Sequence, residues 1–152
     1  MEEHSGYFNR RAAAKGLKSR VLCGCRNRVL LLVYSERLLE KRLSDIKVRD
    51  LLARFGYGEN LSVEECLDHL SLRIEESSEF PHEMGLFLDY PVEDVVGFIR
   101  NKGENFKLCG CWKVYGCEKS ARRKFANYDK CRKFLCNKLN EGADIYQALK
   151  IS

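Results

Sequence analysis

The sequence predicts an α+β fold in which a small mixed sheet of three to four strands packs with about six helices. Two adjacent β-rich runs predict an N-terminal hairpin, the residues after them have a helical period, and two later strand-like runs alternate with helices. The chain has 152 residues, of which 45% are hydrophobic and 32% charged. This is enough to bury a core, and we expect a single domain over residues 1–152.

The first elements are a short helix and a hairpin. Residues 7–15 favour a helix that Gly16 ends, and residues 19–25 and 28–34 favour two strands joined by a tight turn at residues 26–27. Because the second of these strands is almost entirely apolar, we expect it in the middle of the sheet, covered on both faces.

Three helices are expected next, each with apolar positions at helical spacing. Gly56 ends the second helix as a C-cap, and Ser62 with Glu65 forms a capping box at the start of the third. The apolar positions are Leu38, Leu39 and Leu43 in the first; Val48, Leu51, Leu52 and Phe55 in the second; and Val63, Cys66, Leu67, Leu70 and Ile74 in the third.

The remaining elements alternate between strands and helices. In chain order we expect a strand over 84–88, a helix that begins at Pro91 and that Gly103 ends, an alternating strand over 106–114, a long helix over 117–139 that Gly142 ends, and a short helix over 145–149. In the alternating strand, Cys109, Cys111 and Lys113 share one face, and Trp112 lies on the other.

The termini and the charge pattern limit the function classes. The first residues are acidic and polar, unlike a signal peptide, and the longest apolar run, residues 29–34, is too short to cross a bilayer. We therefore expect a cytoplasmic protein with reduced thiols and no membrane partner. Residues 1–50 carry 12 Lys and Arg against 6 Asp and Glu, residues 51–100 carry 3 against 11, and residues 101–152 carry 12 against 5. These segments could pair within the fold or present separate faces.

Two stretches carry a family resemblance. They are EFPHEMGLFLDYPVEDV at 79–95, and WKVYG at 112–116 after GFI at 97–99. In these stretches the sequence resembles an uncharacterised bacterial family, domain of unknown function 3793, found mainly in anaerobes. The resemblance covers about residues 7–140 and implies no activity, cofactor or catalytic residue. It implies a further N-terminal segment with a His-Cys pair, absent here, so we expect either a short member or a truncated start.

The first candidate site is a group of thiols near the alternating strand. Lys113 stands beside two of them, and an ammonium group favours the thiolate form. Three thiolates and one further ligand would complete a tetrahedral site for zinc or iron. The candidate ligands are Cys109, Cys111, Cys117, His82 and Cys131. A bolder arrangement joins the C-x-C pairs at 23–25 and 109–111 on adjacent strands. The alternative is that these cysteines are small buried hydrophobes, which the lack of any C-x-x-C pair favours.

The second candidate site is the pair His82 and Glu83, between an expected helix and an expected strand. An imidazole next to a carboxylate could share a metal or move a proton. The alternative is a structural turn in which His82 bonds to the backbone.

The third candidate site is the basic face of the long helix, formed by Lys119, Arg122, Arg123, Lys130 and Lys133. Such a face could bind phosphates, or it could simply be solvated. Arg132 falls on the apolar side, where it could snorkel or pair with a buried acid. Trp112 and Tyr115 could stack a base or a flavin, although core packing is favoured. The expected buried stripe is Ala121, Phe125, Tyr128, Cys131, Leu135 and Leu139.

No phosphate-loop, dinucleotide-binding or nucleophile-elbow motif occurs, so we do not expect an enzyme of a familiar class. We expect a cytosolic accessory protein that binds a soft metal or a protein partner through its cysteine-rich C-terminal half. The alternatives are a module that binds nucleic acid or another anionic partner through the basic helix face, and a thiol redox protein.

Overall fold

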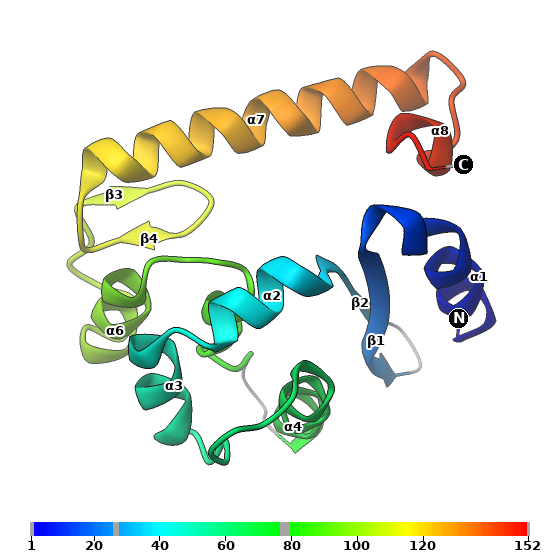
Figure 1. Ribbon diagram of the computed structural model, residues 1–152. Coiled ribbons are helices and arrows are strands. Elements are labelled where there is room, and N and C mark those ends of the chain that lie inside the picture. Colours follow the sequence, from blue (N-terminus) through cyan, green and yellow to red (C-terminus); the bar gives the residue numbers. More distant parts are fainter. Residues whose placement is uncertain (1, 26–27, 77–79, 152) are drawn as a thin grey trace. The chain divides into compact units, whose positions relative to one another are not determined.

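The computed structural model describes residues 2–25, 28–76 and 80–151, which form helices and short strands (Figure 1). The predicted α+β class is therefore confirmed. The chain divides into two compact units, Met1–Val92 and Glu93–Ser152. The described strands form two separate two-stranded antiparallel sheets, one in each unit, and not the one mixed sheet that the sequence predicted.

Several helix ends of the first unit follow the local sequence signals. Gly16 ends the first helical segment with φ 63°, and Asp45 caps the third α-helix by accepting from two backbone N–H groups. The predicted capping box is present, since Ser62 and Glu65 bond reciprocally at 2.8 and 3.2 Å. The elements are α1 (Glu2–Ala12), η1 (Ala13–Lys15), β1 (Leu17–Cys25), β2 (Arg28–Ser35), α2 (Glu36–Leu43), α3 (Ile46–Ala53), α4 (Val63–Glu76) and α5 (Met84–Phe87). The predicted turn at residues 26–27 lies outside the described residues.

Strand β2 is not covered on both faces, which corrects the prediction from its apolar sequence. Leu32 and Tyr34 are buried, but Val29, Leu31 and Val33 on the other face are 42%, 45% and 48% exposed. The physical reason is that the described residues pack on the face with Leu32 and Tyr34 and leave the face with Val29, Leu31 and Val33 largely uncovered.

Residues 84–88 form the one-turn helix α5 and not a strand. Met84, Leu86 and Phe87 are all buried, and the Leu88 N–H donates to the Met84 carbonyl at 3.2 Å. A short apolar run is equally consistent with a buried strand and a buried helical turn, and periodicity does not distinguish them. No described strand lies beside this segment to pair with it.

The second unit is built from a helix, a hairpin and a long helix. Its elements are α6 (Val92–Arg100), β3 (Leu108–Cys109), β4 (Lys113–Val114), α7 (Glu118–Asn140) and α8 (Ile145–Ala148). The predicted strand over 106–114 is folded back on itself, because β3 and β4 pair antiparallel across a turn at residues 110–112. A Cβ atom on Gly110 would lie 2.3 Å from the Phe125 ring, so only glycine fits where this turn meets α7.

Candidate functional site

A buried carboxylate, Asp94 of α6, holds the hairpin of the second unit in place. Its Oδ2 accepts from Trp112 Nε1 at 2.7 Å, and its Oδ1 accepts from the backbone N–H groups of Tyr115 and Gly116 at 2.8 and 2.7 Å. The side chain is almost completely enclosed, so these three donors replace water. Asp94 therefore fixes the β3–β4 hairpin against α6.

Lys113 and Tyr115 also make contacts within the second unit. Lys113 Nζ donates to the Gly103 carbonyl at 2.6 Å and lies 5.0 Å from the centre of the Phe106 ring. The Tyr115 ring packs on α6, where a Cβ on Gly97 would lie 2.3 Å from it. These contacts give both side chains a structural role in the folded unit.

Trp112 links the β3–β4 hairpin to α7. Its side chain is 7% exposed, and its ring meets Phe125 edge-on with a centroid distance of 4.5 Å. A second edge contact joins it to Tyr128 at 6.2 Å. The predicted alternative that Trp112 packs in a core matches this placement, and the contact fixes the first half of α7 on the hairpin.

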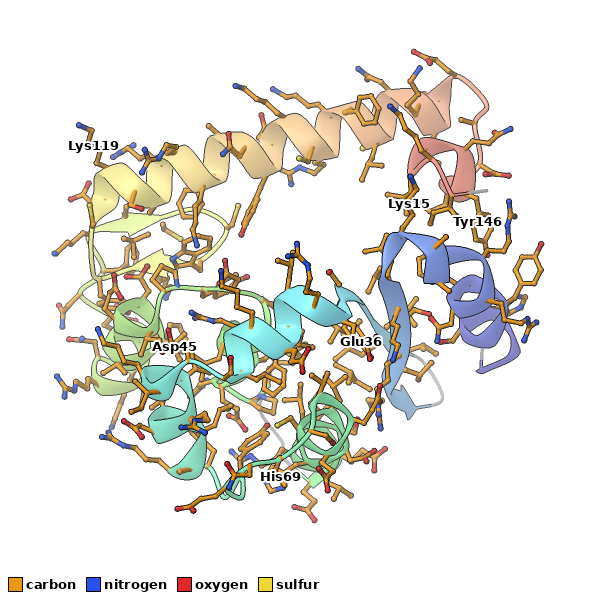
Figure 2. All side chains as sticks on the ribbon, in the orientation of Figure 1. Lys15, Glu36, Asp45, His69, Lys119 and Tyr146 are labelled. Atoms are coloured by element: carbon orange, nitrogen blue, oxygen red, sulfur yellow. The ribbon has the colours of Figure 1, made fainter. Side chains whose placement is uncertain are left out.

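The basic face of α7 is exposed along its length. The predicted helix over 117–139 is observed as α7, Glu118–Asn140, and Figure 2 shows Lys119 at its N-terminal end directed away from the helix. The basic-face residues Lys119, Arg122, Arg123, Lys130 and Lys133 are all exposed. Among the described residues, Lys119, Arg123 and Lys130 form no ion pair. Arg122 and Lys133 pair only within the helix, with Glu118 at 3.5 Å and Asp129 at 2.8 Å.

The predicted buried stripe of α7 is covered only near the start of the helix. Ala121 is buried and Phe125 is half-buried, whereas Tyr128, Cys131 and Leu139 are exposed. The helical period correctly placed these residues on one side. It does not report what covers that side, because a period identifies a face but not its partner.

Arg132 does not pair with a buried acid. It bonds to Asp129 on the preceding turn at 3.3 Å, and both side chains are exposed. The hydrogen bond from Lys133, together with the one from Arg132, lowers the pKa of Asp129.

The candidate thiols lie at different places in the second unit. Cys109 is in β3, Cys111 is in the hairpin turn, Cys117 is at the N-cap position of α7, and Cys131 is on the exposed part of that helix. Because Cys109 and Cys111 are separated by the turn, they do not share the face of one strand. Cys117 and Cys131 are about 21 Å apart along the helix axis, at about 1.5 Å per residue, so one ion does not contact both.

Within the described ranges, no group of three or more His, Cys, Asp and Glu side chains is placed to hold a metal ion. The C-x-C pairs at 23–25 and 109–111 lie in separate sheets. A zinc or iron site at Cys109, Cys111 and Cys117, and a thiol redox function, stay predictions.

His82 and Glu83 lie in the first unit and have different environments. His82 is exposed, whereas Glu83 is fully buried and accepts from Arg73 Nε at 2.6 Å through Oε1. Glu83 Oε2 and the Tyr57 hydroxyl are both buried and without a hydrogen-bond partner among the described groups. Burial, reinforced by the charge of Glu83, raises the pKa of Tyr57.

Three residues of these two buried clusters, Asp94, Arg73 and Tyr57, were missed by sequence reasoning. Asp94 lies in the helical run that begins at Pro91, where an acidic residue in the first turn is usually explained by the helix dipole. Its neighbour in space, Trp112, is 18 positions away, so no local spacing connects them. The signal that was present is the occurrence of both residues in the stretches that carry the family resemblance.

The fold and this surface define an α+β protein whose second unit presents a long, exposed basic helix. The family described as "Protein of unknown function (DUF3793)" matches residues 2–149, and the chain belongs to this family. No curated protein and no solved structure matches the chain. In the described part of the chain, every helix is too short or too polar to span a bilayer.

Proposed function

We propose that this protein is a cytosolic accessory protein that binds an acidic protein partner through α7. The observation that carries the proposal is the exposure of this helix. Of its 23 residues only Ala121 is fully buried, and its exposed surface is rich in cations and apolar side chains.

The charge of the helix favours an acidic partner. Lys119, Arg123 and Lys130 have no carboxylate within ion-pair distance among the described residues, so they are free to meet one on a partner. The pairs of Arg122 and Lys133 within the helix are exposed, and such pairs contribute only about 0.3–0.5 kcal/mol. A partner's carboxylates can therefore replace them at little cost.

The apolar side chains on the side of α7 opposite its basic face favour a protein over a nucleic acid. Tyr128, Leu135 and Leu139 follow one another at spacings of seven and four residues, so they lie on one side of the helix, and Tyr128 and Leu139 are exposed. Helices that bind in a protein groove insert anchors with this spacing. A phosphate backbone offers no apolar groove for these side chains.

The attachment of α7 also favours binding. The contacts of Trp112 with Phe125 and Tyr128 hold the first half of the helix on the hairpin, and Asp94 holds the hairpin on α6. A helix that is already ordered loses less conformational entropy on binding. The second unit is thus suited to present α7 in a fixed form.

Nucleic acid is the second candidate, and one observation favours it. Lys119 and Lys133 are separated by about 21 Å at about 1.5 Å per residue, and the basic face between them matches the length of several successive phosphates. Salt weakens both kinds of binding, so salt dependence does not separate them. The contribution of the apolar anchors to the affinity distinguishes a protein partner from a nucleic acid.

The test uses the full chain and two fluorescent probes of similar charge. One is a peptide of about 21 residues in which a leucine follows every two glutamates, and the other is an oligouridine of about 15 nucleotides. We expect the peptide to bind more tightly near physiological salt. Leu135→Ser with Leu139→Ser should weaken only the peptide. Tighter binding of the RNA, unaffected by the two serine substitutions, would favour the nucleic-acid function instead.

Charge reversal on the basic face should abolish most of this binding. Arg122→Glu combined with Arg123→Glu is expected to weaken peptide binding at least about tenfold at low salt, because each change replaces an attraction by a repulsion. The matched control is Arg37→Glu with Arg49→Glu, which makes the same change of net charge on exposed positions of α2 and α3. Equal weakening by both pairs, measured by fluorescence anisotropy, would show that the net charge acts and not α7.

A further inference from the structure

The two outer edges of the β1–β2 hairpin have different hydrogen-bonding surroundings in the first unit. Gly16 and Glu36 form a backbone hydrogen bond of 3.2 Å, and the register pairs Ser19 with Val33 and Val21 with Leu31. Hydrogen-bonded and non-hydrogen-bonded pairs alternate along an antiparallel ladder. Ser19, Leu31 and Val33 are consequently in non-hydrogen-bonded pairs, and their backbone N–H and C=O groups point away from the partner strand.

The outer edge of β1 is capped by α1. Asn9 Oδ1 accepts from the Ser19 N–H at 2.6 Å, and Asn9 Nδ2 donates to the Ser19 carbonyl at 3.0 Å. Ser5 adds a further hydrogen bond of 3.0 Å to the same carbonyl. Helix α1 therefore supplies the hydrogen bonds that another strand would have made there.

The outer edge of β2 has no such cap among the described residues. The outward backbone groups of Leu31 and Val33 meet no side chain or strand of the part of the chain that the structure describes, and their side chains are 45% and 48% exposed. Residues 29–34 contain no charged residue and no proline. Folded proteins usually protect a long apolar edge with one of these devices, since an unprotected edge pairs with other strands.

A pocket lies beside this edge. It has a volume of about 540 Å³, and its apolar lining comes from Leu32, Leu39 and Phe87 at the hairpin, α2 and α5, with the exposed side chains of Leu38 and Leu88. The lining also includes four charged residues, Lys41, Arg42, Asp45 and Asp89. When a strand is added to a sheet edge, its backbone supplies hydrogen bonds and its alternate side chains enter adjacent pockets. The edge and the pocket together form a docking surface for a strand, which we call the β2 edge.

We propose that the β2 edge binds the β2 edge of a second copy of this chain, and that the two hairpins form one four-stranded antiparallel sheet. A two-fold axis at Leu31 would pair Leu31 with Leu31 of the second copy, and Val29 with Val33. All three residues have exposed side chains on the same face, so the pairing aligns like with like.

The charges and the pocket favour a second copy over another peptide. Two uncharged strands approach without repulsion, whereas a charged peptide would find no counter-charge between residues 29 and 34. In the same register Leu30 of the second copy stands opposite Leu32, which lines the pocket. Since α1 caps the β1 edge at Ser19, a further strand is blocked at that point, and we expect the assembly to close at two copies.

Sedimentation velocity of the full, reduced chain tests the proposal over about 1–500 µM, a range that resolves micromolar dissociation constants. We expect the mass to rise from one chain of 17.6 kDa toward two chains and to stop there. Leu31→Lys, which places a charge on an exposed edge position, should keep the protein monomeric over the whole range. The matched control is Leu72→Lys on the exposed side of α4, which should dimerise like the native chain.

Hydrogen exchange identifies which surface is used. The amides of residues 29–34 should become more protected as concentration rises, in the native chain and in Leu72→Lys but not in Leu31→Lys. A chain that stays monomeric, a dimer that leaves these amides unchanged, or an assembly that grows beyond two copies would overturn the proposal. None of these results depends on α7, so they are distinguishable from a failure of partner binding.

Discussion

Asp94→Asn is expected to destabilise the second unit by about 3 kcal/mol. The substitution turns one carboxylate oxygen into an NH₂ group, which then faces either Trp112 Nε1–H or the two backbone N–H groups of residues 115 and 116. Each buried donor that loses its acceptor costs about 1–3 kcal/mol, and more when the acceptor was charged. Chemical denaturation followed by tryptophan fluorescence measures the effect, because Trp112 is the sole tryptophan of the chain.

The matched control for this change is Asp144→Asn in the same unit. Asp144 is the exposed N-cap of α8 and accepts from the Gln147 N–H at 2.7 Å. Asparagine caps helices about as well as aspartate, so the control should change the free energy of unfolding by less than about 0.5 kcal/mol. A cost for Asp94→Asn no larger than the control would contradict the role of Asp94 as the anchor of the hairpin.

Arg73→Met is expected to destabilise the first unit by about 2–4 kcal/mol. Glu83 is fully buried, and Arg73 is its ion-pair partner at 2.6 Å. Removing one partner of a buried pair leaves an uncompensated charge, which typically costs about 3–5 kcal/mol. The expected value is somewhat smaller because the Arg73 side chain is 36% exposed, so water reaches part of the site.

Since tryptophan fluorescence reports on the second unit, the effect of Arg73→Met is measured by hydrogen exchange of α4, residues 63–76. The double variant Arg73→Met with Glu83→Leu should be more stable than Arg73→Met alone, because it removes the unpaired charge as well. Arg54→Met, at the exposed C-cap of α3, is the control and should have almost no effect. A double variant less stable than the single one would contradict this explanation.

The sequence predicted most helices of this fold because their ends carry local signals. Helix starts are marked by side chains that accept backbone hydrogen bonds, as at Asp45 and in the Ser62 capping box. Helix ends are marked by glycines 16, 56, 103 and 142, all of which have positive φ. The strands were harder, because their identity depends on distant partners. Residues 84–88 became a helical turn, and residues 106–114 became a hairpin whose turn fits Gly110 against Phe125.

The part of the candidate site that lies on α7 was predictable, because it depends on local helical signals. The basic face of α7 follows from helical spacing alone, and the structure confirms the helix that carries it. The expected convergence of thiols depended on a straight strand over 106–114, which the hairpin replaces. The hydrogen bond between Asp94 and Trp112, which anchors the hairpin, joins separate elements. The spacing of residues along the sequence does not reveal such a contact.

The central claim is that α7 presents its length to a partner instead of burying it. Thiol alkylation of the reduced native chain tests this most directly, because Cys131 and Cys136 lie on α7, whereas Cys66 is buried and its burial raises its pKa. Rates measured by peptide mass spectrometry are divided by those in denaturant, which removes differences in intrinsic reactivity. We expect Cys131 and Cys136 to react nearly as fast as in the unfolded chain, and Cys66 to be strongly protected. Protection of Cys131 equal to that of Cys66 would contradict the claim.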